Sequence, residues 1–154
     1  MLASTLTYGF PYGQSKHRQV GWGLGGRMPY EATRFVAAQG LEGNIFNDYG
    51  DGAFLIYHLY PKVRPVMDSR IDVYGSELAR EYFASRDDPL KFFQYLNKYN
   101  VALILLRKTK KNLQINQYLN YIPATKLLLE TKDRLLFSYD PKLLPPEILQ
   151  PKAP

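Results

Sequence analysis

The chain contains no cysteine, and this absence excludes several kinds of site. Disulfide bonds, thiolate metal sites and cysteine nucleophiles all require a sulfhydryl group. Histidine is almost as scarce, because His17 and His58 are the only two imidazoles in 154 residues. Two histidines are too few for an ordinary zinc site unless carboxylates complete it. We therefore expect no structural metal and no cofactor.

The chain also lacks a long apolar run, since none approaches the roughly 20 residues that span a bilayer. Its first ten residues, MLASTLTYGF, carry no positive charge ahead of a long apolar stretch and so do not form a signal peptide. These two absences predict a soluble piece of protein. They also favour a native start upstream of Met1.

What the chain does contain is enough apolar material for one folded domain. Apolar residues make up 45% of the sequence and aromatic residues 14%, which suffices for a hydrophobic core. The 20 basic and 14 acidic side chains give a formal net charge of +6. This charge indicates attraction to anionic surfaces, without distinguishing nucleic acid from lipid headgroups or from simple solubility.

Glycine and proline divide the chain into three regions. Residues 1–28 are rich in glycine and aromatic residues and predict a linker or a membrane-proximal segment. Residues 29–141 alternate helical and strand patterns and predict the folded α/β domain. Residues 142–154 form a proline-rich tail that we expect to be extended and mobile.

Within the middle region, capping and periodicity predict helices over 29–40, 51–61, 76–88, 89–100 and 111–120. Ser76 and Asp88 are the expected N-caps of the third and fourth of these helices. Strands are predicted over 43–48, 63–68 and 101–108, and a hairpin over 124–140. Pro65 favours an edge position for the second strand. The alternation predicts an α/β fold with a layered, mostly parallel sheet, flanking helices and a C-terminal antiparallel hairpin.

Polar side chains follow the predicted parallel strands at the edge where such sheets bind ligands. The residues expected to gather there are Asn47, Asp48, Asp68, Arg70, Arg107 and Lys108. The acids of NDYGDG and MDSRID suit a carboxylate pair for acid–base work or a divalent cation. Alternatively, Asp48 and Asp68 bind backbone amides and Arg70 pairs with one of them, as a structural clamp. We favour the clamp.

Three other patterns are weaker. Gly21, Gly23 and Gly26 satisfy G-x-G-x-x-G, but no apolar strand precedes them, which favours a glycine-rich linker over a dinucleotide site. The basic run RKTKK at 107–111 suits phosphate groups, and a solvated loop explains it equally well. His58 lies among apolar residues, and no G-x-S-x-G nucleophile motif is present, which favours a packed histidine.

Residues 29–83 read PYEATRFVAAQGLEGNIFNDYGDGAFLIYHLYPKVRPVMDSRIDVYGSELAREYF. This stretch resembles a region of polytopic bacterial membrane proteins of the glycosyltransferase C class, relatives of lipid-phosphate-sugar-dependent mannosyltransferases and of oligosaccharyltransferases. The shared pattern is P-x-x-A, G-x-x-F-N-x-Y, G-x-x-L-I, an aromatic–proline pair, D-G-R and D-x-Y-G. The matching positions are Pro29, Ala32, Gly43, Phe46, Asn47, Tyr49, Gly52, Leu55, Ile56, Tyr60, Pro61, Asp68, Arg70, Asp72, Tyr74 and Gly75. Ser69 stands where the family has glycine, and the resemblance extends over about residues 21–106.

The resemblance implies the soluble C-terminal domain of a membrane glycosyltransferase-like protein, on the extracytoplasmic (periplasmic) face of the inner membrane. In that family the catalytic acid lies on a loop between membrane helices, so the isolated domain is expected to be non-catalytic. Its implied partners are the membrane helices of the parent protein and a glycan or lipid-linked sugar acceptor, rather than nucleic acid. The residues expected to fix the strand-end loops are Asn47, Asp48, Asp68, Arg70 and Asp72, with Tyr49 and Tyr74 packed beside them.

Two alternatives from other classes stay open. A freestanding nucleotide- or nucleic-acid-binding module would use residues 107–111 and the crevice of the sheet, and its affinity would fall steeply with salt. A small hydrolase would use Asp48 and Asp68 and would show turnover as a purified chain. The sequence does not decide the oligomeric state.

Overall fold

The computed structural model describes residues 10–11, 19–20, 28–110 and 112–149. Near the N-terminus, β1 (Phe10–Pro11) and β2 (Gln19–Val20) pair antiparallel. The remainder of the predicted linker before Met28 lies outside the described residues, and so does the G-x-G-x-x-G pattern. Among the described residues, the α-helices and the main sheet lie within residues 29–141, where the α/β domain was predicted.

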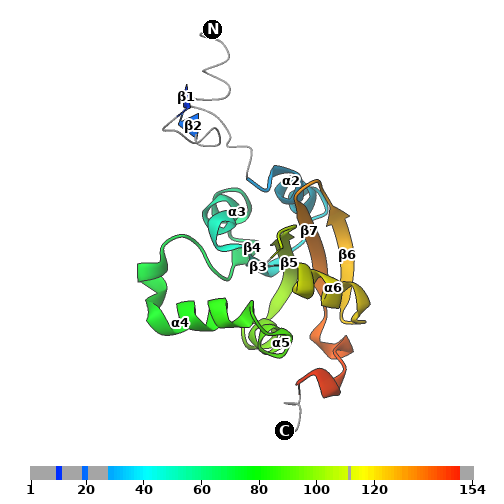
Figure 1. Ribbon diagram of the computed structural model, residues 1–154. Coiled ribbons are helices and arrows are strands. Elements are labelled where there is room, and N and C mark those ends of the chain that lie inside the picture. The colour runs from blue at the N-terminus through cyan, green and yellow to red at the C-terminus, as the bar shows by residue number, and fades with distance from the viewer. Residues whose placement is uncertain (1–9, 12–18, 21–27, 111, 150–154) are drawn as a thin grey trace.

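The main sheet has five strands in the order β4-β3-β5-β7-β6 (Figure 1). They are β3 (Gly43–Asn47), β4 (Val63–Pro65), β5 (Val101–Arg107), β6 (Thr125–Glu130) and β7 (Arg134–Tyr139). β3 runs parallel to β4 and β5, whereas β7 runs antiparallel to β5 and β6. The predicted α/β class is therefore confirmed, but the sheet is mixed rather than mostly parallel. A short turn reverses the chain between β6 and β7. Because β7 pairs with β5, it lies inside the sheet, and β6 forms the edge.

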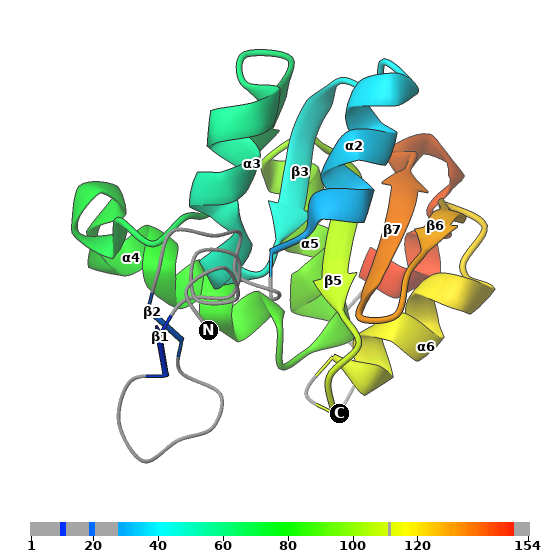
Figure 2. The ribbon, with the colours of Figure 1, turned by 90° about the horizontal axis from the view of Figure 1, so that it is seen from above.

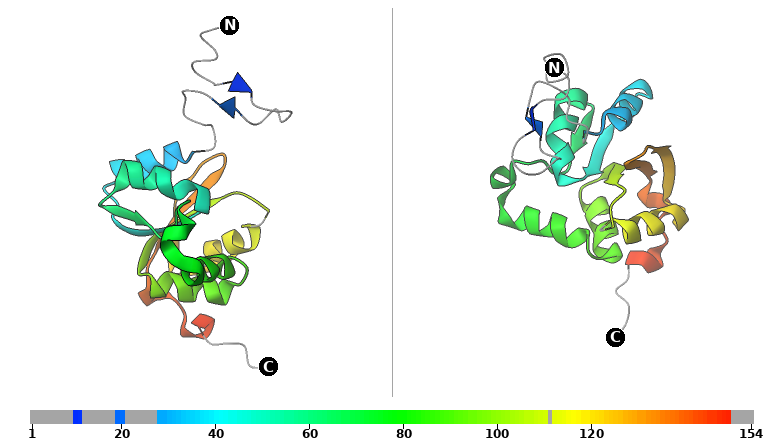
Figure 3. Two further views of the ribbon diagram at one scale, coloured as in Figure 1. Left: turned by 90° about the vertical axis from the view of Figure 1, so that its left-hand side faces the viewer. Right: turned by 45° about the horizontal axis from the view of Figure 1, so that its top comes forward.

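Helices cover both faces of this sheet (Figures 2 and 3). α2 (Tyr30–Ala38) and α3 (Gly52–Leu59) pack on one face, and α4 (Ile71–Ser85), α5 (Pro89–Lys98) and α6 (Leu113–Tyr121) pack on the other. The alternation of side chains along β5 produces this arrangement. Leu103 and Leu105 join the core under α2 and α3, while Ile104 and Leu106 join the core under α4, α5 and α6.

Local rules explain some of the element ends. The Asp88 side chain accepts a hydrogen bond from the Leu90 amide at 2.8 Å, so its predicted role as the N-cap of α5 is confirmed. β4 is an edge strand, as Pro65 indicated. α4 joins two helical segments across a kink at Gly75 (φ 77°, ψ 160°), and the second segment begins beside Ser76, where a helix was predicted to start. The first segment, from Ile71, was not predicted. Glycine adopts this positive φ without strain, which lets the chain turn between the two segments.

Two other expectations are corrected. The tail is not extended up to residue 149, because it forms the 3-10 turns η2 (Pro141–Leu143) and η3 (Pro146–Leu149). Leu144 is buried and Ile148 packs against the same core, so apolar burial folds this segment back. His58 is exposed rather than packed in the core, with its ring centroid 4.3 Å from that of Phe54.

Candidate functional site

The sheet topology has a switch point at the carboxyl ends of β3 and β5. The helices that follow these two strands, α3 and α6, pack on opposite faces of the sheet, and ligands in α/β proteins commonly bind at such a point. In this protein a carboxylate fills the junction. Asp48 directly follows β3, and its Oδ2 accepts a hydrogen bond at 2.7 Å from the backbone N–H of Arg107 at the end of β5.

Arg86, near the end of α4, is the hub of a buried network around Asp48. Its Nη2 donates to Asp48 Oδ1 at 2.5 Å and to Asn112 Oδ1 at 2.6 Å, and its Nη1 donates to the Tyr82 hydroxyl at 2.9 Å. The Tyr82 hydroxyl in turn donates to the backbone oxygen of Asn47 at 2.8 Å. Burial raises the pKa of Tyr82 to about 12, so this hydroxyl keeps its proton. The network joins α4, β3 and the start of α6.

A second carboxylate, Asp51, lies beneath this network in the 3-10 turn η1 (Tyr49–Asp51) and has no exposed surface. Arg107 Nη2 donates to its Oδ1. Arg134, the first residue of β7, donates from Nε to Oδ2 at 3.0 Å and from Nη2 to Oδ1 at 3.1 Å. Two arginines from neighbouring strands therefore share one buried acid, and their Coulombic attraction offsets the cost of taking that acid out of water.

The third carboxylate, Asp68, follows β4 and is also fully buried. Arg70 binds it through two nitrogens, with Nη2 2.6 Å from Oδ2 and Nε 3.1 Å from the same oxygen, and the Arg70 amide donates to Oδ1 at 2.8 Å. The hydrogen bonds from the Arg70 guanidinium hold the pKa of Asp68 below its usual range, against the opposing effect of burial. This geometry matches the interpretation of MDSRID as a clamp.

Close backbone packing fixes the Asp68 turn against α3. A Cβ atom on Gly52, the first residue of α3, would lie 2.1 Å from the backbone oxygen of Met67 and 2.7 Å from the Asp68 Cα. Only glycine fits this approach. From the other side, Asn47 Nδ2 donates to the Met67 oxygen at 2.8 Å, which links the ends of β3 and β4.

The remaining predicted residues surround this turn. The Tyr49 hydroxyl donates to the backbone oxygen of Ser69 at 3.0 Å. Tyr74 is half-buried, and burial, followed by the nearby Asp68 carboxylate, raises its pKa. Asp72 lies in the first turn of α4, and its side chain is outside the part that the structure describes. Ser69 does not have a positive φ, because Asn100 is the only described non-glycine residue that does, so serine fits without backbone strain.

The sequence pattern included Asp51 only as one of the acids of NDYGDG, and it missed three members of the network: Arg86, Asn112 and Arg134. Arg134 was placed in the turn TKDR, yet it is 3% exposed. Lys108 was expected among the strand-end residues, but its Nζ binds Glu130 Oε1 at 2.6 Å and the Thr131 oxygen at 2.5 Å. An arginine at the end of a helix or in a turn carries no local signal of burial, because its partner lies far away in sequence.

The arrangement is that of a clamp rather than of an acid–base pair. Asp48, Asp51 and Asp68 each accept a hydrogen bond from an arginine side chain, so each carboxylate is already bound by a cation. In the described part of the chain, no three residues of the His, Asp or Glu type are grouped so as to hold a metal ion. The network connects the carboxyl ends of β3, β4 and β5 with the start of β7.

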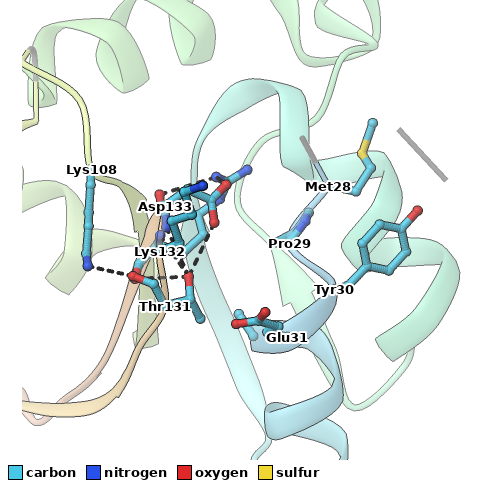
Figure 4. Close-up of a pocket in the computed structure, with 10 residues that line it drawn as sticks. Met28, Pro29, Tyr30, Glu31, Lys108, Thr131, Lys132 and Asp133 are labelled. Atoms are coloured by element: carbon cyan, nitrogen blue, oxygen red, sulfur yellow. Dashed lines mark hydrogen bonds and ion pairs between the residues drawn. The ribbon is translucent and has the colours of Figure 1, made fainter. Parts of the chain in front are cut away.

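A cavity of about 480 Å³ lies beside this network, between the start of α2 and the turn joining β6 to β7 (Figure 4). Figure 4 shows Lys108, Thr131 and Asp133 on one wall and the Glu31 carboxylate on the opposite wall. Charges of both signs line it, and Asp133 Oδ2 is bound by Arg134 Nη1. The cavity therefore does not select a ligand of one charge.

Comparison of the chain with protein-family models, with curated proteins and with solved structures finds no match. Among the helices of the described residues, none combines the length and the apolar character needed to cross a membrane.

Proposed function

We propose that this chain is a non-catalytic extracytoplasmic domain of a membrane glycosyltransferase-like protein, which supports the membrane part, contacts a glycan or protein acceptor, or does both. The observation that supports a non-catalytic role is the pairing of each buried strand-end acid with arginine. A general base needs a carboxylate with a pKa near the working pH and access to substrate. Asp51 and Asp68, which have no exposed surface, offer no such access.

The parent protein is proposed from the sequence pattern, and the network gives that pattern a physical reason. Asn47, Asp68 and Arg70 carry the resemblance, and all three fix the loops at the ends of β3 and β4. Gly52 is a further matching position, and it is the glycine on which close packing against Asp68 depends. Matching residues that hold two strand ends together suit a domain with a structural or binding role rather than a catalytic one.

The coding DNA upstream of Met1 tests the membrane parent. The proposal expects the reading frame to continue into several apolar segments of roughly 20 residues each. A genuine start codon at Met1 would contradict the proposal of a membrane parent. Turnover by the purified chain, abolished by Asp48→Asn without unfolding, would favour a hydrolase instead.

The absence of cysteine permits a sharp test of location. Lys126→Cys introduces one thiol at an exposed position of β6 in the full-length protein, whose other cysteines are replaced by serine. In intact cells a maleimide that does not cross the inner membrane should label this thiol. Labelling only after cell lysis would contradict an extracytoplasmic position. Leu136→Cys, at a fully buried position, is the control for background labelling.

The alternative, a nucleotide- or nucleic-acid-binding module, is favoured by one observation. Lys110 is exposed and has no acidic partner in the described part of the chain. Binding of a nucleic acid would weaken steeply with rising salt, whereas a packing role or a glycan contact would show little salt dependence. Fluorescence anisotropy with a labelled oligonucleotide at two salt concentrations separates these functions.

A further inference from the structure

A second cavity, of about 430 Å³, lies beside α6 and away from the buried acids of the clamp. It is open between α6, the loop after β5 and the ends of β6 and β7. Its lining combines two lysines, one glutamate, three amide side chains and an apolar floor. The residues that matter for its chemistry are Lys110, Asn116, Gln117, Asn120, Glu130 and Leu135.

The charge of this cavity is positive by one unit. Lys108 also lines it, but its ammonium group binds the Glu130 carboxylate at 2.6 Å, so the two charges balance. Lys110 has no such partner among the described residues and keeps its charge available at the rim. A ligand with one negative group matches this balance, because a Lys ammonium forms its strongest hydrogen bonds with an anionic oxygen.

The amide groups require more than an anion. Asn116 is 7% exposed, and its Oδ1 is buried without a hydrogen-bond partner. A carboxylate ion by itself only accepts hydrogen bonds and leaves this oxygen unsatisfied, and inorganic phosphate has too few O–H groups to serve all three amide side chains of the cavity. A hydroxyl group both donates and accepts, and it therefore suits Asn116 and also the amides of Gln117 and Asn120.

The floor of the cavity is apolar. Leu135, the second residue of β7, lines it and is 8% exposed. A ring whose C–H groups form one face and whose hydroxyls point outward would place that face on Leu135 and its hydroxyls on the amides. This combination of groups is found in carbohydrates.

We propose that this cavity binds a carbohydrate carrying one anionic group, either a phosphate or a carboxylate. Lys110 would bind the anionic group, and the amides of α6 would bind ring hydroxyls. The inference deepens the proposed function and rests on it, because it names the part of the chain through which an acidic glycan acceptor would be contacted.

Amide chemical shifts of the ¹⁵N-labelled full chain provide the test. The probes are glucose 6-phosphate, glucuronate, glucose and inorganic phosphate, each at the same ionic strength and pH. The first two should shift the amides of residues 108–120 and 130–135, and one of them should bind more tightly, which identifies the anionic group. Glucose and inorganic phosphate should each bind at least about tenfold more weakly. If inorganic phosphate binds as tightly as the charged sugars, the cavity is an anion site only. If glucose binds as tightly as the charged sugars, Lys110 does not contribute to binding.

Two variants locate the site. Lys110→Gln should weaken binding of the charged sugars by about tenfold and leave glucose unchanged. Lys126→Gln makes the same charge change at an exposed position of β6 outside the cavity, and it should leave every affinity unchanged. Asn116→Ala should weaken binding of all the sugars. The inference is overturned when Lys110→Gln and Lys126→Gln have equal effects, or when no probe shifts the cavity amides.

The two proposals fail separately. Binding at this cavity by a chain that genuinely starts at Met1 would keep the site and remove the membrane parent. Upstream apolar segments without binding by any probe would remove the site and keep the membrane parent.

Discussion

Arg134 binds both carboxylate oxygens of Asp51, although 83 positions separate the two residues in sequence. Both side chains are buried, with 0% of Asp51 and 3% of Arg134 exposed. Asp51 lies in the turn after β3, and Arg134 begins β7. This contact therefore joins the parallel half of the sheet to the antiparallel hairpin.

Replacing Asp51 by asparagine should destabilise the protein strongly. The substitution keeps the shape of the side chain but leaves Arg107 and Arg134 facing a neutral amide, and breaking a buried ion pair in this way costs about 3–5 kcal/mol. Urea unfolding followed by circular dichroism measures the loss. Asp133→Asn is the matched control, because that carboxylate also binds Arg134 but is 54% exposed, and it should cost less than about 1 kcal/mol. Equal losses in the two variants would contradict the structure.

Gly52→Ala should also destabilise the fold, by about 1–3 kcal/mol or more. The added Cβ would lie 2.1 Å from the Met67 oxygen, so α3 or the Asp68 turn has to move. The control is Gly50→Ala in the same turn region, where the nearest atom, Arg107 Nη2, is 3.7 Å away. Thermal unfolding of both variants checks the difference, and a Gly52→Ala variant as stable as Gly50→Ala would show that the approach is looser than described.

The Asp68–Arg70 pair predicts a pH dependence of stability. The pKa of Asp68 in the folded protein lies below its ordinary value of 3.8, chiefly because of the Arg70 hydrogen bonds. At a pH between the folded-state pKa and the ordinary value, the unfolded chain therefore binds more protons than the folded protein. The stabilisation is therefore present above about pH 4 and is lost as the pH falls through the folded-state pKa.

Arg70→Gln tests this dependence. The variant should raise the pKa of Asp68 and lower the urea midpoint near neutral pH, and its difference from the wild type should vanish once the pH falls below the pKa of Asp68 in the folded wild type. Arg64→Gln is the control. Arg64 is exposed, lies within β4, and has no acidic partner among the described residues. A pH-dependent difference of the same size in Arg64→Gln would assign the effect to net charge instead of to the pair.

Tyr82→Phe should cost about 1–3 kcal/mol, because the hydroxyl both donates to the Asn47 oxygen and accepts from Arg86. Removing it leaves two buried polar groups with one partner fewer. Tyr118→Phe removes a hydroxyl from a side chain that is 52% exposed and should leave stability unchanged. Guanidinium unfolding of both variants measures the contrast, and a neutral Tyr82→Phe would mean that the network around Arg86 adds nothing to stability.

Local patterns predicted most elements but not the charge network. The strand VALILLRK and the cap at Asp88 follow from apolar runs and capping chemistry, which act over a few residues. The pairing of Asp68 with Arg70 was also predictable, because two positions separate them. Arg86 and Arg134 were not predictable, since their partners Asp48 and Asp51 approach only after the sheet has formed. The helix start beside Ser76 was predictable, whereas the helical segment that precedes Gly75 was not.

The sequence by itself determined that these 154 residues contain no thiol, that they carry a positive net charge and that they fold as an α/β domain. Composition and periodicity decide these properties, because they depend on residue type and on short-range spacing. Only the tertiary structure decided that β7 lies next to β5, which brings Arg134 to Asp51. Strand order decides which distant charges meet, and strand order depends on packing both faces of the sheet at once.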